Sequence, residues 1–375
     1  MSDTAPLASQ PESEPGVDSP AAVTWADPQR YTAFGHWLGQ IGPEHGLDPA
    51  SMRLASADAS FRRYLRIDSA AGTRIIMDAP PDKENCEPFV RVAELMARAG
   101  LRVPQVLAWD RTQGFLLLSD LGRQTMLQAI DQDNAQVNLA LYLQAVDALV
   151  TWQRASRPGV LPAYDEATLQ RELGLFPQWY LQQHRAVTPD TRMQETLSTT
   201  FAHIVRNNLC WPSVFVHRDF MPRNLMMPVP GDGPASAPSA LGVLDFQDAV
   251  FGPITYDIAS LMRDAFLSWD EEFVLDVTIR YWEKARAAGL PVGPDFGAFY
   301  RGVEWMGLQR HLKVAGIFTR LTLRDGKPQY LADTPRFIQY IRATAARYRE
   351  LRPLLRLVDQ VEGIEARSGF AYGRI

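Results

Sequence analysis

The chain has 375 residues, of which 46% are hydrophobic and 22% are charged, and its formal net charge is −5. A chain of this length can bury a sizeable core and form two or three domain-sized units. The acidic balance and the absence of a basic run argue against nucleic acid or a membrane surface as a partner, and no apolar run approaches the roughly 18 residues that span a bilayer.

Cysteine content and the N-terminus indicate the compartment. Cys86 and Cys210 are too few for a disulfide framework, and the first residues lack the basic and apolar regions of a signal peptide. We therefore expect a cytoplasmic protein. Residues 1–26 are rich in Pro, Ser, Ala, Asp and Glu, so we predict a disordered tail with too little apolar surface to pack.

Residues 27–120 are predicted to form a small N-terminal lobe. The apolar spacing of residues 31–41, which follow Asp27 and Pro28, predicts a leading helix. A second helix is expected over 87–99, ended by Gly100. Strands are predicted at 53–55, 61–67, 73–77, 103–109 and 115–119.

Residues 121–375 are predicted to form a mostly helical C-terminal lobe. Two short apolar strands, 214–216 and 241–244, interrupt the helices, and the segment 228–240 between them is rich in Pro and Gly, which predicts a mobile loop. Apolar periodicity predicts the helices at 139–152, 169–182, 196–207, 256–266, 273–288 and 300–315.

The polar residues after these two strands have the spacing of a phosphoryl-transfer site. His217, Arg218 and Asp219 follow the first strand, four residues separate Asp219 from Asn224, and Asp245 ends the second strand. Phosphoryl transfer needs a carboxylate to accept the hydroxyl proton and oxygen ligands for Mg²⁺ beside the triphosphate.

We interpret Asp219 as the catalytic base, and Asn224 and Asp245 as the ligands of Mg²⁺ and its nucleotide, brought together by adjacent strands. His217 would brace the loop. The alternative is a pair of ordinary strand-end turns, which does not account for both motifs in this order.

Together these motifs resemble the aminoglycoside phosphotransferase-like kinases over residues 30–350, through HRDFMPRN, LDFQDA and PITYDIASLMRD. The resemblance implies an α+β fold, bilobal and protein-kinase-like, with ATP and Mg²⁺ as cofactors and a small hydroxylated substrate. Asp257 is similar to the family's buried aspartate that holds the catalytic loop, although a helix N-terminus favours a carboxylate in any case.

Three further segments point to a subgroup of that family. DASFRRYLRID, IIMDAPP and GLQRHLKVAGIF look most like the bacterial kinases that phosphorylate the anomeric hydroxyl of N-acetylmuramate or N-acetylglucosamine in peptidoglycan recycling. This resemblance implies an amino sugar as the small-molecule partner beside the nucleotide.

The predicted nucleotide loop departs from the kinase pattern. The small lobe has no G-x-G-x-x-G, so the loop would run from Ser56 to Ser60, where small side chains let backbone amides approach phosphate. An ordinary turn is the alternative.

A cation and a hinge complete the expected nucleotide site. The strand lysine of kinases is missing, and Arg62, Arg63 or Lys83 could replace it, with Arg63 preferred; solvated arginines on an outer sheet face are the alternative. Adenine would bind the backbone of a hinge between Ser119 and Leu121.

Several polar residues are candidates for binding the acceptor, since carboxylates, amides and cations suit a hydroxyl-rich ring. Arg310 or Lys313 would pair with the lactyl carboxylate of N-acetylmuramate, although a solvated charged helix face is the alternative. Arg223 could contact phosphate or pair with an acid. The acceptor candidates are Asp219, Asp248, Glu304, Gln309, Arg310 and Lys313.

Other functions stay open at this stage. A kinase for an aminoglycoside, choline or homoserine is the nearest, and the acid-rich segment 264–272 would suit a cationic acceptor. The missing strand lysine also permits a pseudokinase that binds nucleotide without transfer. A protein kinase is excluded because no Ala-Pro-Glu follows the Asp245 motif.

Overall fold

The structure, a computed structural model, describes residues 23–57, 61–228 and 240–365. This part of the chain forms two compact units, one made of the residues up to Leu95 together with Val103–Arg123, and the other of Met96–Arg102 together with the residues from Gln124 onward. The sequence analysis divided the chain at residues 120 and 121. Most of the predicted tail and of the predicted loop over 228–240 lies outside the described residues.

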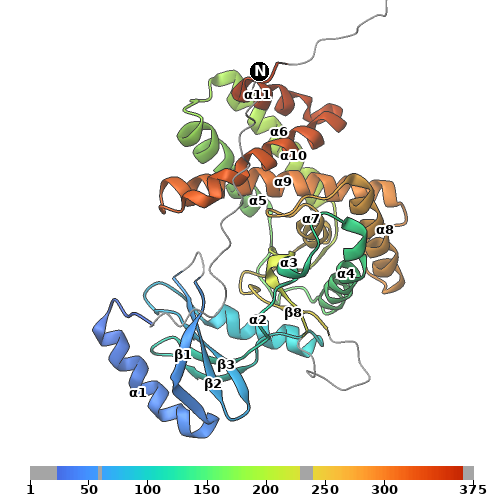
Figure 1. Cartoon of the computed structure of the whole chain (residues 1–375). Coiled ribbons are helices and arrows are strands. Elements are labelled where there is room, and N and C mark those ends of the chain that lie inside the picture. The colour runs from blue at the N-terminus through green and yellow to red at the C-terminus, as the bar shows by residue number, and fades with distance from the viewer. Residues whose placement is uncertain (1–22, 58–60, 229–239, 366–375) are drawn as a thin grey trace, which may run out of the picture. The chain divides into compact units, whose positions relative to one another are not determined.

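The first unit is built on a five-stranded antiparallel sheet with the order β1-β2-β3-β5-β4 (Figure 1). Each predicted strand is present, and the antiparallel sheet expected for the small lobe is confirmed. The strands are β1 (Leu47–Ala57), β2 (Arg63–Ser69), β3 (Gly72–Asp78), β4 (Val106–Asp110) and β5 (Phe115–Ser119).

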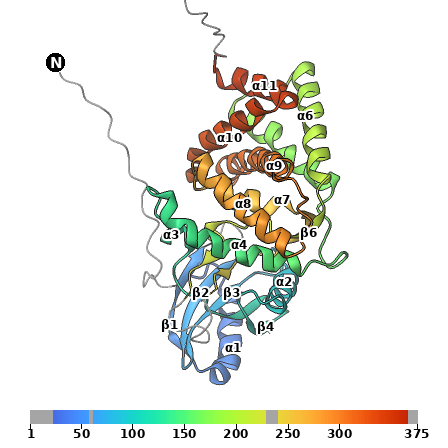
Figure 2. The ribbon, with the colours of Figure 1, turned by 90° about the vertical axis from the view of Figure 1, so that its right-hand side faces the viewer.

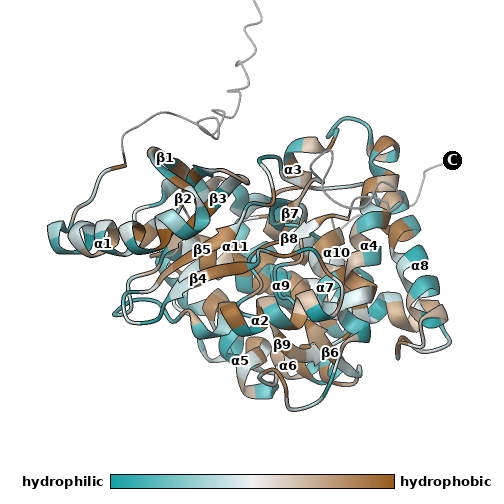
Figure 3. Cartoon of the chain, turned by 90° about the horizontal axis from the view of Figure 1, so that it is seen from below, coloured by the Kyte–Doolittle hydropathy of each residue, from teal (hydrophilic) through white to brown (hydrophobic). Residues whose placement is uncertain are grey.

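Helix α1 (Pro28–His45) covers one face of this sheet. The Asp27 carboxylate caps its start by accepting from the Gln29 N–H, and Phe34 and Trp37 pack in one apolar cluster with Leu65 of β2. In Figure 3, β4 and β5 are mostly hydrophobic, whereas α1 is mixed along its length, as an amphipathic covering helix should be. Helix α2 (Glu87–Arg98) ends before Gly100, whose φ is 91°.

The packed structure begins before the predicted start of α1. Val23 and Trp25 pack against the α1–sheet cluster, and the Trp25 ring lies 4.7 Å from the ring of Phe34. The Arg63 guanidinium lies 3.9 Å above the Trp25 ring. The prediction of disorder through residue 26 is therefore wrong at these positions, because an average over 26 residues hides two apolar side chains.

The second unit is mostly helical, as predicted (Figure 2). Two helices near its C-terminus, α10 and α11, had not been predicted. The helices are α3 (Met126–Ala129), α4 (Leu139–Arg154), α5 (Glu166–Leu173), α6 (Thr191–Leu209), α7 (Thr255–Met262), α8 (Glu271–Ala287), α9 (Phe296–Leu323), α10 (Thr334–Arg347) and α11 (Arg352–Glu362), with short 3₁₀ turns η1 (Ala135–Asn138), η3 (Pro222–Asn224), η4 (Pro328–Asp333) and η5 (Arg349–Leu351).

Helix α9 runs through the middle of this unit and contacts α6, α7, α8 and α10. Two glycines allow α9 to pack closely against neighbouring residues. A Cβ added to Gly302 would lie 2.3 Å from the indole nitrogen of Trp211, and one added to Gly316 would lie 2.5 Å from the backbone carbon of Leu175. Because neighbours surround it, α9 buries charged side chains as well as apolar ones.

The single helix predicted over 169–182 is in fact two elements. Helix α5 ends at Leu173, and η2 (Phe176–His184) is a π-helix. Within η2 the Phe176 ring stacks on the Tyr180 ring with centroids 5.2 Å apart, and the Tyr180 ring lies 5.4 Å from that of His184. An apolar pattern alone does not distinguish this change of helix type.

Two small sheets carry the predicted catalytic segments. Strand β6 (Ser213–Val216) pairs with β9 (Val250–Pro253), and β7 (Leu225–Met226) pairs with β8 (Gly242–Val243). The predicted strands 214–216 and 241–244 are therefore not partners of each other. Instead, each pairs with a short strand that had not been predicted.

The packing of Trp25 can be tested by truncation. We expect Trp25→Ala to lower the free energy of unfolding by about 1–3 kcal/mol, because it removes a half-buried ring and the cation–π contact with Arg63. Phe61→Ala is the control, since that aromatic side chain is 67% exposed. Urea unfolding followed by circular dichroism measures both, and equal effects of the two changes would contradict this role of Trp25.

Candidate active site

A buried carboxylate holds the loop that follows β6. Asp257, on α7, is fully buried and accepts the backbone N–H groups of His217 at 2.7 Å and Arg218 at 3.0 Å. Arg218 has a φ of 80°, a conformation that a side chain other than glycine rarely adopts. The two hydrogen bonds offset this strain, so that Asp257 determines the path of the chain into Asp219.

His217 connects this loop to β8. Its Nδ1 accepts the Asp219 N–H at 3.2 Å, so its Nε2 carries the hydrogen and donates to the Leu244 carbonyl at 2.9 Å. Burial lowers the pKa of His217 to about 4, which keeps the ring neutral. The predicted brace therefore has a geometry that joins the two motif segments.

Asn224 and Asp245 lie together, at the point where β7 and β8 pair. The Asn224 amide nitrogen donates to the Asp219 carbonyl at 2.9 Å and to Asp245 Oδ2 at 3.3 Å, and the Leu244 N–H donates to the Asn224 carbonyl at 2.9 Å. Asp245 has a φ of 61° and accepts from the Gln247 amide at 2.8 Å. The structure thus brings Asp219, Asn224 and Asp245 into one group.

The donor set at this group suits Mg²⁺. A carboxylate and an amide oxygen are hard ligands, and Mg²⁺ is commonly held by one or two such groups, with the remaining positions filled by nucleotide phosphates and water. Within the described residues, no group of three or more His, Cys, Asp or Glu side chains could hold a metal ion by itself. Asn224 and Asp245 are thus two residues that could each contribute one oxygen ligand to such an ion.

Cations beneath the loop set the charge of Asp219. Its side chain is 36% exposed, and the Arg310 guanidinium lies 3.8 Å from its Oδ1. Burial would raise the pKa of Asp219, but the positive charges of Lys313, Arg310 and Arg218 outweigh it and hold the pKa below its usual value. The carboxylate is thus ionised at neutral pH.

Glu172 of α5 balances these cations. It accepts from Arg218 at 2.5 Å, lies 3.3 Å from the Lys313 ammonium and accepts from the Tyr164 hydroxyl. Arg310 donates to the Arg218 carbonyl and lies 4.9 Å over the Tyr256 ring. Sequence reasoning missed Glu172, since nothing in the local pattern of α5 distinguishes it from a surface glutamate.

The acceptor residues predicted on α9 are buried within the unit. Glu304 is 4% exposed and accepts from Arg347 at 2.5 Å, and Gln309 is fully buried and donates to the Leu169 carbonyl at 3.0 Å. Lys313 also donates to the Tyr256 hydroxyl at 3.3 Å. The expectation that these side chains face a sugar is corrected here, as is the alternative of a solvated face, because α9 has neighbours on every side.

Two other residues near the loop remain exposed or partly exposed. Asp248 is exposed in the turn after Asp245. Arg223, between Pro222 and Asn224 in η3, is half-buried, and its guanidinium lies 5.0 Å over the Phe266 ring. Either side chain is accessible to a small ligand.

The structure does not support all of the residues in the first unit that were predicted to bind the nucleotide. Ser60 lies outside the described residues, and Ser56 belongs to β1 instead of a loop. Arg63 donates to Asp78 at 2.7 Å and to the Thr24 carbonyl at 2.7 Å. Its guanidinium is thus held within the sheet and by Trp25, which contradicts the preference for Arg63 as the phosphate-binding cation.

The alternative cations and the hinge also lie in this unit. Arg62 pairs with Glu84 at 3.1 Å, and Lys83 is half exposed beside Asp82. At the predicted hinge, the Ser119 N–H donates to the Gln105 carbonyl at 2.9 Å, and Leu121 is 7% exposed. The Ser119 N–H is therefore already engaged.

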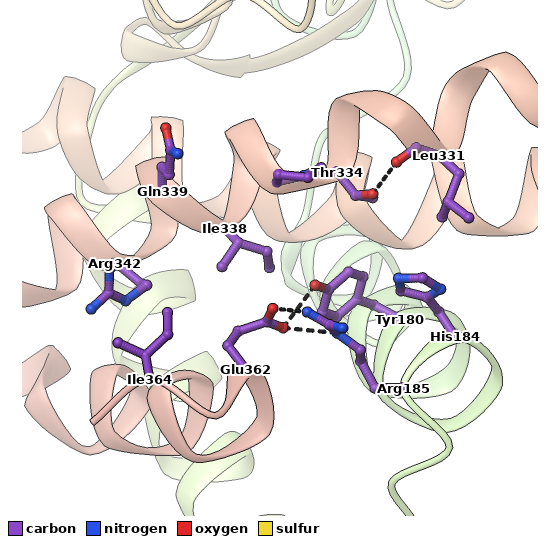
Figure 4. Close-up of a pocket in the computed structure, with 11 residues that line it drawn as sticks. Tyr180, His184, Arg185, Leu331, Thr334, Ile338, Gln339, Arg342, Glu362 and Ile364 are labelled. Carbon is purple, nitrogen blue, oxygen red and sulfur yellow. Dashed lines mark hydrogen bonds and ion pairs between the residues drawn. The ribbon is translucent and has the colours of Figure 1, made fainter. Parts of the chain in front are cut away.

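A separate pocket of about 500 Å³ lies in the second unit between η2, α10 and α11 (Figure 4). Its charged groups are already partnered, since Glu362 accepts from Tyr180 at 2.8 Å and from Arg185 at 3.0 Å. Arg342 is likewise paired with Asp359 at 2.5 Å. The lining includes none of the residues of the catalytic loop.

Cys86 and Cys210 are both free thiols. None of the helices in the described part of the chain has both the length and the apolar composition to cross a membrane.

Comparison with known sequences identifies a matching family. Residues 51–291 match the model described as the phosphotransferase enzyme family. A protein of Neisseria meningitidis named N-acetylmuramate/N-acetylglucosamine kinase is 46% identical over 347 residues, which are 92% of this chain and 100% of that protein. A protein of the same name from Pseudomonas aeruginosa is 47% identical over 349 residues, or 91% of this chain and 100% of its own.

Comparison with solved structures confirms the predicted fold class. An ethanolamine kinase of Plasmodium vivax matches with a TM-score of 0.58 at 10% identity, covering 90% of this chain and 93% of that one. An ADP-bound aminoglycoside phosphotransferase matches with a TM-score of 0.53 at 15% identity, covering 84% and 97%. At these identities the similarity concerns the fold alone.

The charge balance at Glu172 predicts a large effect of its removal. We expect Glu172→Gln to lower the free energy of unfolding by about 3–5 kcal/mol, because it leaves buried cations without their shared carboxylate. Glu166→Gln is the control, since Glu166 lies exposed on the same helix. Chemical denaturation measures both, and a loss below about 1 kcal/mol for Glu172→Gln would contradict this role.

The burial of Asp264, which follows α7, leads us to expect that the stability of the protein depends on pH. Burial raises its pKa to about 7 from an ordinary value of 3.8, so between these values the folded protein keeps a proton that the unfolded chain has released. Rising pH therefore destabilises the wild type over this window.

Asp264→Asn removes this titration. Its free energy of unfolding relative to the wild type should improve as pH rises from 4 to 7, by up to about 1.4 kcal/mol per pH unit. Urea unfolding at several pH values measures this difference. A difference that stays constant across the window would show that Asp264 is ionised in the folded protein throughout.

Proposed function

The chain belongs to the phosphotransferase enzyme family, and we propose that it transfers the γ-phosphoryl group of ATP to the anomeric hydroxyl of N-acetylmuramate or N-acetylglucosamine. The proposed reaction is supported by the hydrogen bonds that bring Asp219, Asn224 and Asp245 together. The proposed substrate is supported by the similarity, over more than nine-tenths of the chain, to relatives named for these two sugars.

In this proposal Asp219 accepts the proton of the attacking hydroxyl. Its carboxylate is partly exposed and is ionised because of Lys313 and Arg310, so it can orient the hydroxyl and take up its proton as the bond to phosphorus forms. The backbone carbonyl of Asp219 is fixed by the Asn224 amide, which limits the movement of the base. Positioning of this kind is the main contribution of a kinase to catalysis.

Asn224 and Asp245 would hold Mg²⁺ beside this base. An ion held there would supply positive charge that offsets the negative charge developing on the transferred phosphate. The Asn224 amide nitrogen already donates toward Asp219 and Asp245, which leaves its Oδ1 as the ligand atom. Asp257 and His217 contribute indirectly, because their hydrogen bonds fix the conformation of the loop.

The other acceptors considered from the sequence were an aminoglycoside, choline and homoserine, and the similarity to relatives named for two amino sugars favours the sugars over them. The alternative of a pseudokinase is disfavoured because Asp219, Asn224 and Asp245 are all present and in contact through Asn224. We also propose a cytoplasmic location and a place in peptidoglycan recycling, where ATP and these sugars meet; the free thiols of Cys86 and Cys210 fit a reducing compartment.

Replacement of the base tests the mechanism. We expect Asp219→Asn to lower kcat by about 10²–10⁴, because the amide cannot accept the proton, while ATP affinity changes little. Transfer of ³²P from ATP to sugar measures turnover, and thermal shift with ATP and Mg²⁺ measures binding. Glu283→Gln, an exposed acid on α8, is the control. Turnover equal to the wild type would remove the assigned role.

The substrate is tested by a panel of acceptors. N-acetylmuramate and N-acetylglucosamine should be phosphorylated, and ³¹P NMR of the product should show the phosphate on the anomeric carbon. Choline, homoserine and kanamycin serve as the competing classes. Faster turnover of any of these three than of both sugars would overturn the proposed substrate while leaving the kinase chemistry intact.

A further inference from the structure

Arg223 differs from the other cations near Asp219 in that it has no acidic partner among the residues that the structure describes. Arg218 and Lys313 both pair with Glu172, and Arg310 lies beside Asp219. Arg223 is half-buried and stacks on Phe266, yet among the described residues it forms no ion pair. A stacked guanidinium keeps its edge N–H groups available, so this residue is equipped to bind an anion.

The direction of Arg223 separates it from the metal-binding side chains. Arg223 and Asn224 are neighbours in η3, a 3₁₀ turn with about three residues per turn, so their side chains leave the axis about 120° apart. Asn224 points to Asp245, where the metal and the triphosphate would lie. Arg223 points instead to Phe266, in the segment that follows α7.

The segment under Arg223 is held by contacts with its neighbours. The Phe266 N–H donates to Asp264 at 3.2 Å, and its ring lies 6.0 Å from that of Phe318 on α9. The Ala265 carbonyl accepts from Arg336 of α10 at 3.0 Å. The guanidinium is therefore oriented before any ligand arrives, which lowers the entropic cost of binding.

We propose that Arg223 is the specificity residue that binds the lactyl carboxylate of N-acetylmuramate when this sugar is the acceptor. The inference rests on the proposed function. The two sugars differ at this substituent, since N-acetylglucosamine carries a hydroxyl where N-acetylmuramate carries a lactyl ether with its carboxylate. An arginine that lies four residues after the base, and is directed away from the metal ligands, can pair with that carboxylate while Asp219 meets the hydroxyl.

Burial excludes the residues first considered for this task. Arg310 is 3% exposed and donates to the Arg218 carbonyl, and Lys313 is 7% exposed between Glu172 and Tyr256. Neither can reach a ligand without breaking a buried pair, which is costly. N-acetylglucosamine presents no carboxylate, so its binding does not depend on Arg223.

The experiment compares both acceptors on the wild type, Arg223→Met and Arg223→Lys. We expect Arg223→Met to raise KM for N-acetylmuramate about 10- to 100-fold, as for the loss of a charge-assisted hydrogen bond, with less than about a 3-fold change for N-acetylglucosamine. Arg223→Lys should recover part of the affinity, because it restores the charge without the planar fork. Arg286→Met is the matched control, since Arg286 is exposed on α8 and stacks on Trp282 at 4.6 Å.

A change on the ligand provides a second measurement, and its first part uses the wild type alone. The carboxamide of N-acetylmuramate keeps the shape of the lactyl group but removes its charge. The wild type should prefer the acid over the amide by about 10- to 100-fold in kcat/KM, and Arg223→Met should not discriminate between them.

Each outcome decides a different question. Equal losses on both sugars with a raised KM for ATP would assign Arg223 to the nucleotide phosphates and overturn the proposal. Unchanged constants for N-acetylmuramate, or a wild type that does not distinguish acid from amide, would also overturn it. A wild type that phosphorylates neither sugar would instead overturn the proposed function, and this inference with it.

Discussion

The second unit depends on one carboxylate that accepts two consecutive backbone N–H groups. Asp257 fixes His217 and Arg218 from the first turn of α7, where its side chain is fully buried. Arg218 can adopt its positive φ only because these bonds, and its own pairing with Glu172, hold it. The exposure and direction of Asp219 follow from this arrangement, so the chemistry at the surface depends on a contact that lies out of reach of solvent.

Charge balance is the second constraint on the site. Three cations and Glu172 lie under Asp219, so the positive charges outnumber the glutamate that pairs with them. These cations keep the Asp219 carboxylate ionised. Because Arg310 and Lys313 come from α9 while Glu172 comes from α5, the electrostatics of the loop depend on how those helices pack. Helix packing and the ionisation of Asp219 are therefore coupled in this unit.

The motif segments could be predicted from sequence because their spacing is local. To predict Asn224 and Asp245 it was enough to recognise two short strands and the order of the polar residues after them. Both residues lie in one hydrogen-bonded group. Glu172 could not be predicted, since its partners lie 46 and 141 positions away in the chain and only tertiary packing brings them together. Gln309 was misplaced for a related reason. A polar residue on a long helix suggests an exposed face, but α9 is enclosed by neighbouring helices.

The glycines of α9 set a limit on engineering. Exchange of a helical glycine for alanine commonly stabilises a protein by about 0.4–1 kcal/mol, because it restricts the unfolded chain. At Gly302 the added methyl group would clash with the Trp211 side chain, and at Gly316 it would clash with the backbone of Leu175. On α1 the same exchange at positions 35 and 39 meets nothing within 4 Å. A more heat-resistant form of this protein is thus better sought in the leading helix than in the central one.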